Sequence, residues 1–324
     1  MGAALIGIDW GSSSLRGALL AADGTLLASH SAPRGLLSVP AGGWQSVFDA
    51  EFGQWCSAHP TLPVLMAGMV GSRQGWAEAP YCPCPAGVAE LAGALHWLQP
   101  GRLAIVPGVS CGTAAGDTPD VMRGEETQVI GALALLGLQH ATLVLPGTHS
   151  KWVTVADGRV RHFSSHMTGE CYALLRQHSL LARTLPADDT AFIAQAFDAG
   201  VLQAQQPGGL LHHLFSVRSL ALFERLDGLS LASRLSGLVI GEELRAQLAT
   251  PPIASTDAPA AGRAAAPPPD TTSPPLLLVG DALLNQRYQR ALQLLGLPVL
   301  SVGAQASWQG LAALAATLSS SHTS

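Results

Sequence analysis

The sequence predicts an α/β protein built from two duplicated domains with a cleft between them. Its 324 residues exceed what one hydrophobic core comfortably serves, so two domains are expected. A strand, a polar turn, a second strand, an Asp-Gly pair and a third strand follow one another in residues 5–28. The same order recurs in residues 143–163. The repeat indicates an internal duplication of a small α/β unit, each copy giving one polar hairpin to the cleft.

The first domain is expected to span residues 1–120. Short apolar runs between turn residues predict strands, and apolar residues at helical spacing predict helices. Strands are predicted at Leu5–Asp9, Leu15–Leu20, Thr25–Ala28, Val64–Val70 and Leu103–Pro107, and helices at Val47–Ala58 and Ala86–Leu98.

The second domain is expected to span residues 121–324. It begins with a helix at Gly124–Leu138 and the second hairpin. The remaining predicted elements are helices at 167–185, 191–203, 209–226, 231–248, 280–295 and 308–318, and strands at 276–279 and 299–302. Residues 250–275 are dominated by Pro, Ala, Ser and Thr, which cannot bury enough apolar surface to offset chain entropy. We therefore expect a disordered insert there.

Composition excludes several classes of protein. No apolar run reaches the roughly 18 residues that a membrane span needs. A net charge of −5 with scattered basic residues argues against a nucleic-acid partner. The first residues lack a basic signal-peptide region, and the cysteines form no CxxC pair, so a cytoplasmic protein with reduced thiols is expected. The sequence leaves the oligomeric state open, and a homodimer is compatible with it.

The first polar hairpin suits phosphate and magnesium. Asp9 ends a buried strand, and its carboxylate is a hard oxygen ligand for Mg²⁺. Backbone amides and hydroxyls of the turn can hold phosphate oxygens. The phosphate-binding candidates here are Gly11, Ser12, Ser13, Ser14 and Arg16. Taken alone, this segment could also be an ordinary hairpin with a serine-rich turn.

The second polar hairpin contains Gly147, Thr148 and His149, followed by Lys151. It is not a P-loop, because the pattern needs a second glycine further back and a helix directly after it, whereas a strand follows here. Two such turns facing each other could grip a triphosphate from both sides. Together with Gly280 at a late strand-to-helix turn, they resemble the actin-like ATPase and sugar kinase superfamily, of ribonuclease H-like domains, in which Gly280 would hold the adenosine.

Glu125 and Glu126 precede the second hairpin at the start of a predicted helix. Carboxylates are favoured there by the helix dipole alone. One of them could also take the proton from a substrate hydroxyl that attacks the γ-phosphate. Related sugar kinases usually have Asp-Gln here, so the Glu-Glu pair leaves the identity of the base open, with Glu125 preferred on spacing.

A donor-rich loop follows the strand predicted at residues 64–70. A guanidinium such as that of Arg73 binds a carboxylate with two hydrogen bonds, which favours an acidic sugar as substrate. A plain surface loop with one salt bridge is the alternative. The substrate-binding candidates are Ser72, Arg73, Gln74 and Trp76, with Glu78 as a partner for hydroxyls.

Five longer segments narrow the resemblance. AGMVGSRQGWAEAPY, DVMRGEETQVIGAL, LPGTHSKWV, HMTGECYALLRQHSLL and SGLVIGEEL together resemble the 2-dehydro-3-deoxygalactonokinase family. This resemblance implies ATP- and Mg²⁺-dependent phosphorylation of 2-dehydro-3-deoxy-D-galactonate at its C6 hydroxyl, a step of galactonate catabolism. The nearest alternative is a kinase of the same fold that acts on another sugar or sugar acid. A nucleotide-driven sensor or chaperone-like module is the alternative from another class.

Overall fold

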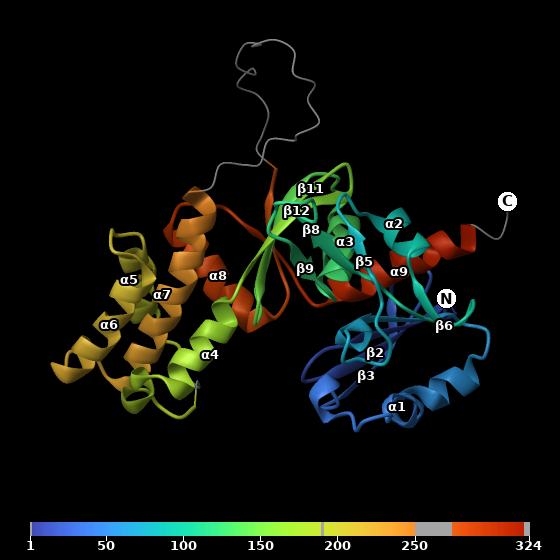
Figure 1. The fold of residues 1–324 in the computed structure, drawn as a ribbon, viewed down its shortest axis with the longest axis horizontal. Helices are drawn as coiled ribbons and strands as arrows, with labels where there is room; N and C mark the ends of the chain where they lie inside the picture. The colour runs from blue at the N-terminus through green and yellow to red at the C-terminus, as the bar shows by residue number, and fades with distance from the viewer. Residues whose placement is uncertain (1, 189–190, 250–273, 321–324) are drawn as a thin grey trace, which may run out of the picture.

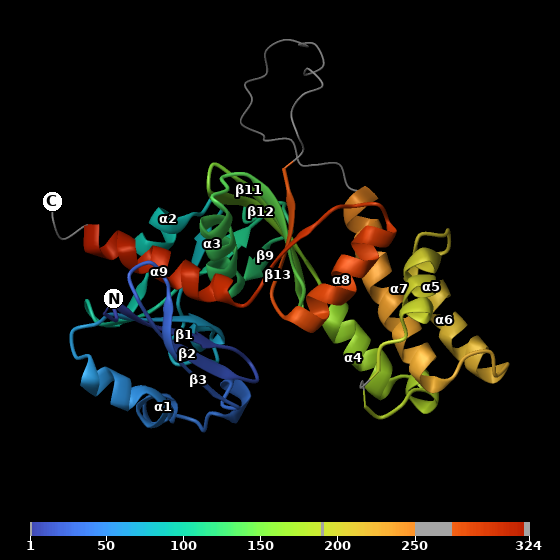
Figure 2. The same ribbon diagram turned by 180° about the vertical axis from the view of Figure 1, so that it is seen from behind.

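The computed structural model describes residues 2–188, 191–249 and 274–320. Figures 1 and 2 show an elongated molecule with a helical bundle at one end and a sheet covered by one helix at the other. A second sheet and several helices lie between these two ends.

The first sheet has six strands in the order β3-β2-β1-β4-β7-β6. Its first three strands form the predicted antiparallel meander, β4 and β7 run parallel to β1, and β6 closes the edge antiparallel to β7. In chain order the strands are β1 (Leu5–Trp10), β2 (Leu15–Leu20), β3 (Leu26–Ala32), β4 (Val64–Gly68), β6 (His96–Gln99) and β7 (Leu103–Ile105).

The second sheet repeats this arrangement in five strands, β12-β11-β10-β13-β14. Three antiparallel strands are again followed by two parallel ones. The strands are β10 (Ala141–Leu145), β11 (Ser150–Ala156), β12 (Arg159–His166), β13 (Leu276–Val279) and β14 (Leu300–Val302). The two sheets therefore share the order and direction of five strands.

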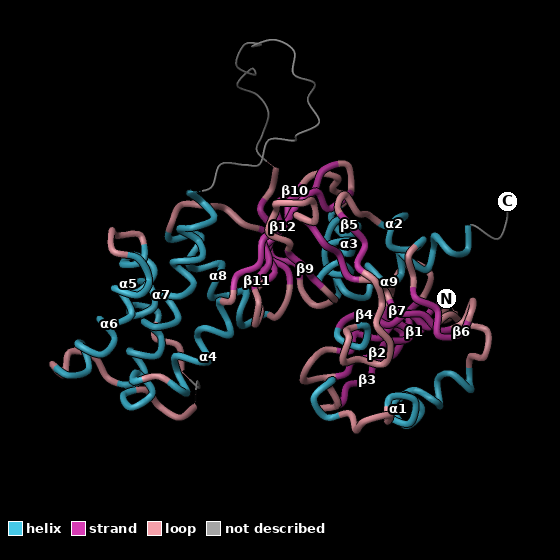
Figure 3. Tube along the Cα trace, in the orientation of Figure 1, coloured by secondary structure: helices cyan, strands magenta, loops and turns pink. Residues whose placement is uncertain are grey.

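The helices fall into three groups. α1 (Trp44–Ala58) packs Phe48 and Phe52 against the first sheet. The bundle at the far end consists of helices joined by loops (Figure 3), and α8 is its member on the side of the second sheet. These five helices are α4 (Thr168–His178), α5 (Ala194–Ala204), α6 (Gly209–Leu222), α7 (Gly228–Ala249) and α8 (Ala282–Leu294).

The third group joins the two sheets. α3 (Glu125–Leu136) packs against the C-terminal helix α9 (Gln305–Ser320), which also contacts β1, β2 and the short helix α2 (Val88–Gly93). One buried apolar cluster includes Leu5 of the first sheet and Leu143 of the second. The core is therefore continuous between the sheets.

Three expectations need correction. Residues 86–98 are not one helix, because α2 ends at Gly93 and the chain then pairs with β7 as β6. The helix predicted at 167–185 ends at His178, and Ser179 caps a separate 3₁₀ turn at Leu180–Thr184. The sequence analysis also missed a small sheet, because its short strands are stabilised by long-range pairing: β5 (Tyr81–Pro83), β8 (Gly108–Cys111) and β9 (Asp120–Met122).

Two composition-based expectations concern the membrane and the insert. Within the described ranges, no helix combines the length and apolarity that a membrane crossing requires. Of the predicted insert at 250–275, residues 250–273 lie outside the described part of the chain.

Candidate functional site

The first predicted phosphate hairpin is a tight turn whose hydroxyls point outward. The Gly11 amide donates to the Ser14 carbonyl oxygen at 2.9 Å, while Ser12 and Ser13 are exposed. Gly35 lies directly behind the turn, since a Cβ there would come within 2.4 Å of the Ser12 carbonyl oxygen. The shape of the turn is therefore fixed from behind, and its serines remain accessible.

Asp9 and Arg16 are opposite each other in the β1–β2 register and form an ion pair at 2.5 Å. The Asp9 carboxylate is mostly buried, and the Arg16 side chain is 42% exposed. Asp9, the predicted metal ligand, is thus oriented by Arg16, which is predicted to bind phosphate.

The second predicted phosphate hairpin packs against the beginning of α4. The Glu170 amide donates to the Thr148 carbonyl oxygen at 3.0 Å, and a Cβ on Gly169 would lie 2.4 Å from the Gly147 carbonyl oxygen. His149 pairs with Glu170 at 2.6 Å. Gly147 and Thr148 are therefore held against the helix, with the Thr148 side chain exposed.

Two glycines bring the carboxylate pair to Asp9. Gly124 precedes α3 with φ 104°, and a Cβ there would lie 3.2 Å from the Cα of Gly68. Gly68 itself ends β4 with φ 93°, close to the Asp9 carboxylate. Positive φ values favour glycine, and neither position has room for a side chain. The start of α3 can therefore reach the edge of the sheet where β1 and β4 end.

The two carboxylates differ in their surroundings. Glu126 is fully buried, and its Oε2 accepts from the Gly124 amide at 2.7 Å. Its Oε1 has no hydrogen-bond partner among the residues that the structure describes. Burial, reinforced by the charge of Glu125, raises the pKa of Glu126 to about 8. Glu125 is only partly buried and accepts from the Arg123 amide at 2.9 Å. Glu126 therefore favours its neutral form at physiological pH.

Glu125 lies between charges from both hairpins. Burial raises its pKa, the nearby Lys151 ammonium opposes this rise, and the Asp9 carboxylate adds to it. Lys151 is 5% exposed and donates to the Ser165 hydroxyl, which in turn donates to Asp120 at 2.6 Å. The sequence left the role of Lys151 open; the structure makes it a buried cation beside Glu125.

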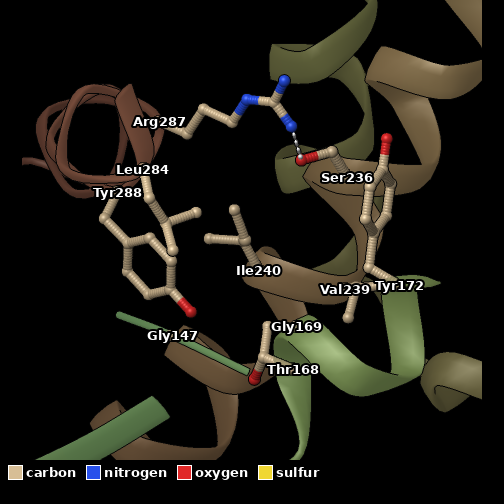
Figure 4. A pocket seen from close by; sticks show the side chains of 10 residues that line it. All are labelled: Gly147, Thr168, Gly169, Tyr172, Ser236, Val239, Ile240, Leu284, Arg287 and Tyr288. Atoms are coloured by element: carbon tan, nitrogen blue, oxygen red, sulfur yellow. Dashed lines mark hydrogen bonds between the residues drawn. The ribbon is translucent and has the colours of Figure 1, made fainter. Parts of the chain in front are cut away.

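A pocket opens between the second hairpin and helices α4, α7 and α8 (Figure 4). Its walls are mainly apolar, with hydroxyls and one guanidinium at intervals. Arg287 reaches across to Ser236 and donates to its hydroxyl at 3.3 Å. The lining residues are Gly147, Thr168, Gly169, Tyr172, Ser236, Val239, Ile240, Leu284, Arg287 and Tyr288.

Gly280, the predicted adenosine residue, lies near the second phosphate hairpin and is not one of the residues that line this pocket. It follows β13 with φ 139°, and its nearest neighbours include the carbonyl oxygen of Pro146. Asp281 caps α8 by accepting from the amides of Leu283 and Leu284. The aspartate after Gly280 therefore has a structural role at the helix start.

The predicted substrate loop has an exposed part and a packed part. The Arg73 side chain is 86% exposed and lies 3.5 Å from Glu78, and Gln74 is also exposed. Ser72 is partly buried. The Trp76 ring instead packs against Phe48 and Trp10, in the core under the first sheet.

Sequence reasoning missed Glu243. This side chain is buried on α7 and accepts hydrogen bonds from β11, α4 and α8. A signal was present, because Glu243 lies on the same helical face as the buried Val239 and Ile240, where a carboxylate needs polar partners.

Comparisons with known proteins come from the sequence and from the fold. The sequence profile of the 2-keto-3-deoxy-galactonokinase family matches residues 9–314. A protein of Escherichia coli (strain K12) named 2-dehydro-3-deoxygalactonokinase is 33% identical over 309 residues, covering 95% of this chain and 96% of that protein. A Rhizobium meliloti (strain 1021) protein assigned the same name is 36% identical, with 95% of both chains covered.

The solved structures agree with the sequence relatives. A crystal structure from Sinorhizobium meliloti, a candidate 2-dehydro-3-deoxygalactonokinase, superposes with a TM-score of 0.83 at 34% identity, covering 97% of this chain and 99% of the other. The activator of 2-hydroxyisocaproyl-CoA dehydratase from Clostridium difficile, with bound ADPNP, has a TM-score of 0.52 at 12% identity, covering 98% and 96%. The second similarity concerns the fold alone.

Proposed function

The chain belongs to the 2-keto-3-deoxy-galactonokinase family, and from this premise we propose that it transfers the γ-phosphoryl group of ATP to the C6 hydroxyl of 2-dehydro-3-deoxy-D-galactonate. The observation that carries the proposal is the position of Glu125, a partly buried carboxylate influenced by Asp9 of the first hairpin and by Lys151, which follows the second. A general base between two phosphate hairpins is the arrangement that this transfer needs.

ATP binds along the two hairpins in this proposal. Exposed Ser12 and Ser13 hold one side of the phosphates, in a turn closed by the hydrogen bond from Gly11 to Ser14, and Gly147 and Thr148 hold the other. The pocket lined by Gly147 accepts the adenosine, since its apolar walls carry a few placed polar groups.

The donor set near Asp9 fits Mg²⁺ held mainly by nucleotide phosphates and water. Such a site needs only one or two carboxylates, and among the described residues no cluster of three or more His, Cys, Asp or Glu forms a dedicated metal cage. Asp9 would hold the ion, because Arg16 occupies one carboxylate oxygen and leaves the other. When bound, Mg²⁺ neutralises charge on the β- and γ-phosphates.

The chemical step assigns different roles to the two adjacent glutamates. Glu125 accepts the C6 hydroxyl proton as that oxygen bonds to the γ-phosphorus, and the bond from phosphorus to the leaving oxygen of ADP breaks. Glu126 is unsuited to this role, since it is buried and favours its neutral form. Its contact with the Gly124 amide instead supports the turn that presents Glu125.

The loop at residues 72–76 binds the acid end of the substrate in this proposal. Arg73 is exposed and, among the described residues, pairs only with the exposed Glu78, so its guanidinium can exchange that partner for a substrate carboxylate. Ser72 and Gln74 lie beside it for hydroxyl contacts, and packed Trp76 anchors the end of the loop.

The first experiment is coupled ADP release with ATP, Mg²⁺ and 2-dehydro-3-deoxy-D-galactonate, next to its gluco epimer and a panel of other sugar acids. We expect fast turnover on the galacto acid and a loss of about 10²–10⁴-fold in Glu125→Gln, with Glu126→Gln as the matched control that retains most activity. Better turnover on another sugar acid would reassign the substrate within the fold. ATP hydrolysis without any phosphorylated acid would refute the kinase.

The origin of the two sheets and the cellular location belong to the same proposal. We infer that the matched strand orders of the two sheets arose by duplication of a ribonuclease H-like unit, as in actin-like ATPases and sugar kinases. We also place the enzyme in the cytoplasm, which is supported by five free cysteines.

A further inference from the structure

Glu243 connects four elements through its carboxylate. Oε1 accepts from the Ser150 hydroxyl at 2.8 Å and from the Trp152 indole at 2.7 Å, both on β11. Oε2 accepts from the Thr168 hydroxyl at the start of α4 and from the Tyr288 hydroxyl on α8 at 2.6 Å. One oxygen therefore holds the strand after the second hairpin, and the other holds two helices.

The elements held by this carboxylate surround the pocket. Thr168 and Tyr288 line it, and Ser150 lies two residues beyond Thr148 of the phosphate hairpin. In Figure 4 the hydroxyls of Thr168 and Tyr288 point to the region beside Gly147. Glu243 lies behind that wall, one helical turn from the lining residues Val239 and Ile240.

The chemistry of the network makes its geometry strict. Glu243 is 3% exposed, and its four donors are neutral, so its charge is stabilised in the interior by hydrogen bonds that must all be well aligned. Burial, and next the Glu243 charge, raises the pKa of Tyr288 well above its usual value. Tyr288 therefore stays protonated and remains a donor.

We propose that Glu243 is a positioning residue for nucleotide binding, which fixes the second phosphate hairpin relative to the α4 and α8 walls of the pocket. The inference rests on the proposed function in one respect, namely that this pocket takes the nucleotide. Glu243 reaches the ligand only through Thr168, Tyr288 and the hairpin, so it acts on nucleotide affinity and leaves the base and the acid-binding loop unchanged.

Glu243→Gln is the informative variant. An amide of the same shape keeps one acceptor oxygen but places an NH₂ group, which cannot accept, at the other position. Either the β11 donors or the helix donors therefore lose their partner. Glu242→Gln is the matched control. Glu242 lies on the same helix and pairs with Arg245, whose side chain is 40% exposed.

The measurement is the Kd for Mg-ADP by calorimetry, together with steady-state kinetics in both substrates. For Glu243→Gln we expect about a tenfold or greater rise in the Kd for Mg-ADP and in the KM for ATP, with the KM for the sugar acid within about threefold of wild type. Glu242→Gln should match wild type. An unchanged Kd, or an equal rise in both KM values, would overturn the inference.

Tyr288→Phe gives a second test in case Glu243→Gln fails to fold. It retains the ring that lines the pocket and removes one donor to Oε2. We expect a smaller rise in the Kd for Mg-ADP, with the sugar-acid KM unchanged; an unaltered Kd would count against Glu243. Wild-type protein that binds Mg-ADP but phosphorylates no sugar acid would overturn the proposed substrate, while the same Kd comparison still decides the role of Glu243.

Discussion

At the scale of single residues, the start of α3 places two adjacent glutamates in different surroundings. Glu126 points into the interior and keeps one oxygen without a partner, whereas Glu125 stays partly accessible beside Asp9 and Lys151. The pair therefore offers two separate predictions, one on stability and one on catalysis.

Glu126→Gln should stabilise the protein increasingly as pH rises. The folded-state pKa is about 8, above the usual 4.5, so between these values the folded protein holds a proton that the unfolded chain releases. Stability from this group is thus lost as pH rises through that window, by up to roughly 1.4 kcal/mol per pH unit. Denaturant unfolding at pH 5 and pH 8 checks this, with exposed Glu78→Gln as control. Equal gains at both pH values would contradict it.

Lys151→Met should shift the pH dependence of catalysis. The base must be deprotonated, and Lys151 opposes the rise that burial causes in the pKa of Glu125. Without this cation the acid limb of kcat/KM should move to higher pH. The control is Arg161→Met, which removes a cation paired with Asp157 in the turn between β11 and β12. The prediction fails if both variants keep the wild-type limb.

At the scale of elements, close contact with α9 holds α3, the helix that begins with Glu125, in place. A Cβ on Gly131 would lie 1.8 Å from the Ala306 carbonyl oxygen, and one on Gly310 would lie 1.9 Å from that of Thr127. The backbones therefore touch where the helices cross, and Thr127 lies two residues after Glu125. The C-terminal helix supports the turn that carries the candidate base.

Gly131→Ala should destabilise the protein by about 1–3 kcal/mol, because the contacted atom is backbone and cannot rotate away. Gly53→Ala in α1 is the matched control: its nearest neighbour is 3.9 Å away, and alanine should stabilise that helix by roughly 0.5–1 kcal/mol. Urea unfolding of both variants measures the difference. A neutral Gly131→Ala would show that the helices separate readily.

At the scale of the whole molecule, the two sheets share one core. Leu311 of α9 is fully buried and reaches Gly7 of β1, and its cluster extends to Leu143 and Leu277 of the second sheet. Such continuity couples the stability of the two halves.

Leu311→Ala should destabilise the protein by about 2–5 kcal/mol and lower hydrogen-exchange protection in β1 and β10 together. Exposed Leu37→Ala, where the side chain is 82% exposed, should leave both unchanged. Loss of protection confined to β1 would indicate that the halves unfold independently.

Features that depend on neighbouring residues can be predicted from the sequence. Strand–turn–strand hairpins, the Asp-Gly turns and the glutamates at the start of α3 are specified by periodicity and turn chemistry within a few positions. These signals located both predicted phosphate turns and most of the elements. They failed for residues 86–98 and for the small sheet, whose strands depend on distant pairing partners.

Features that depend on burial and on distant partners became visible only in the folded structure. It showed that Glu126 is the buried glutamate, that the Trp76 ring packs in the core, and that α9 returns to the first sheet. Glu243 meets Ser150 across 93 positions of the chain. The environment that sets a pKa or satisfies a carboxylate is assembled by packing, and no local pattern contains it.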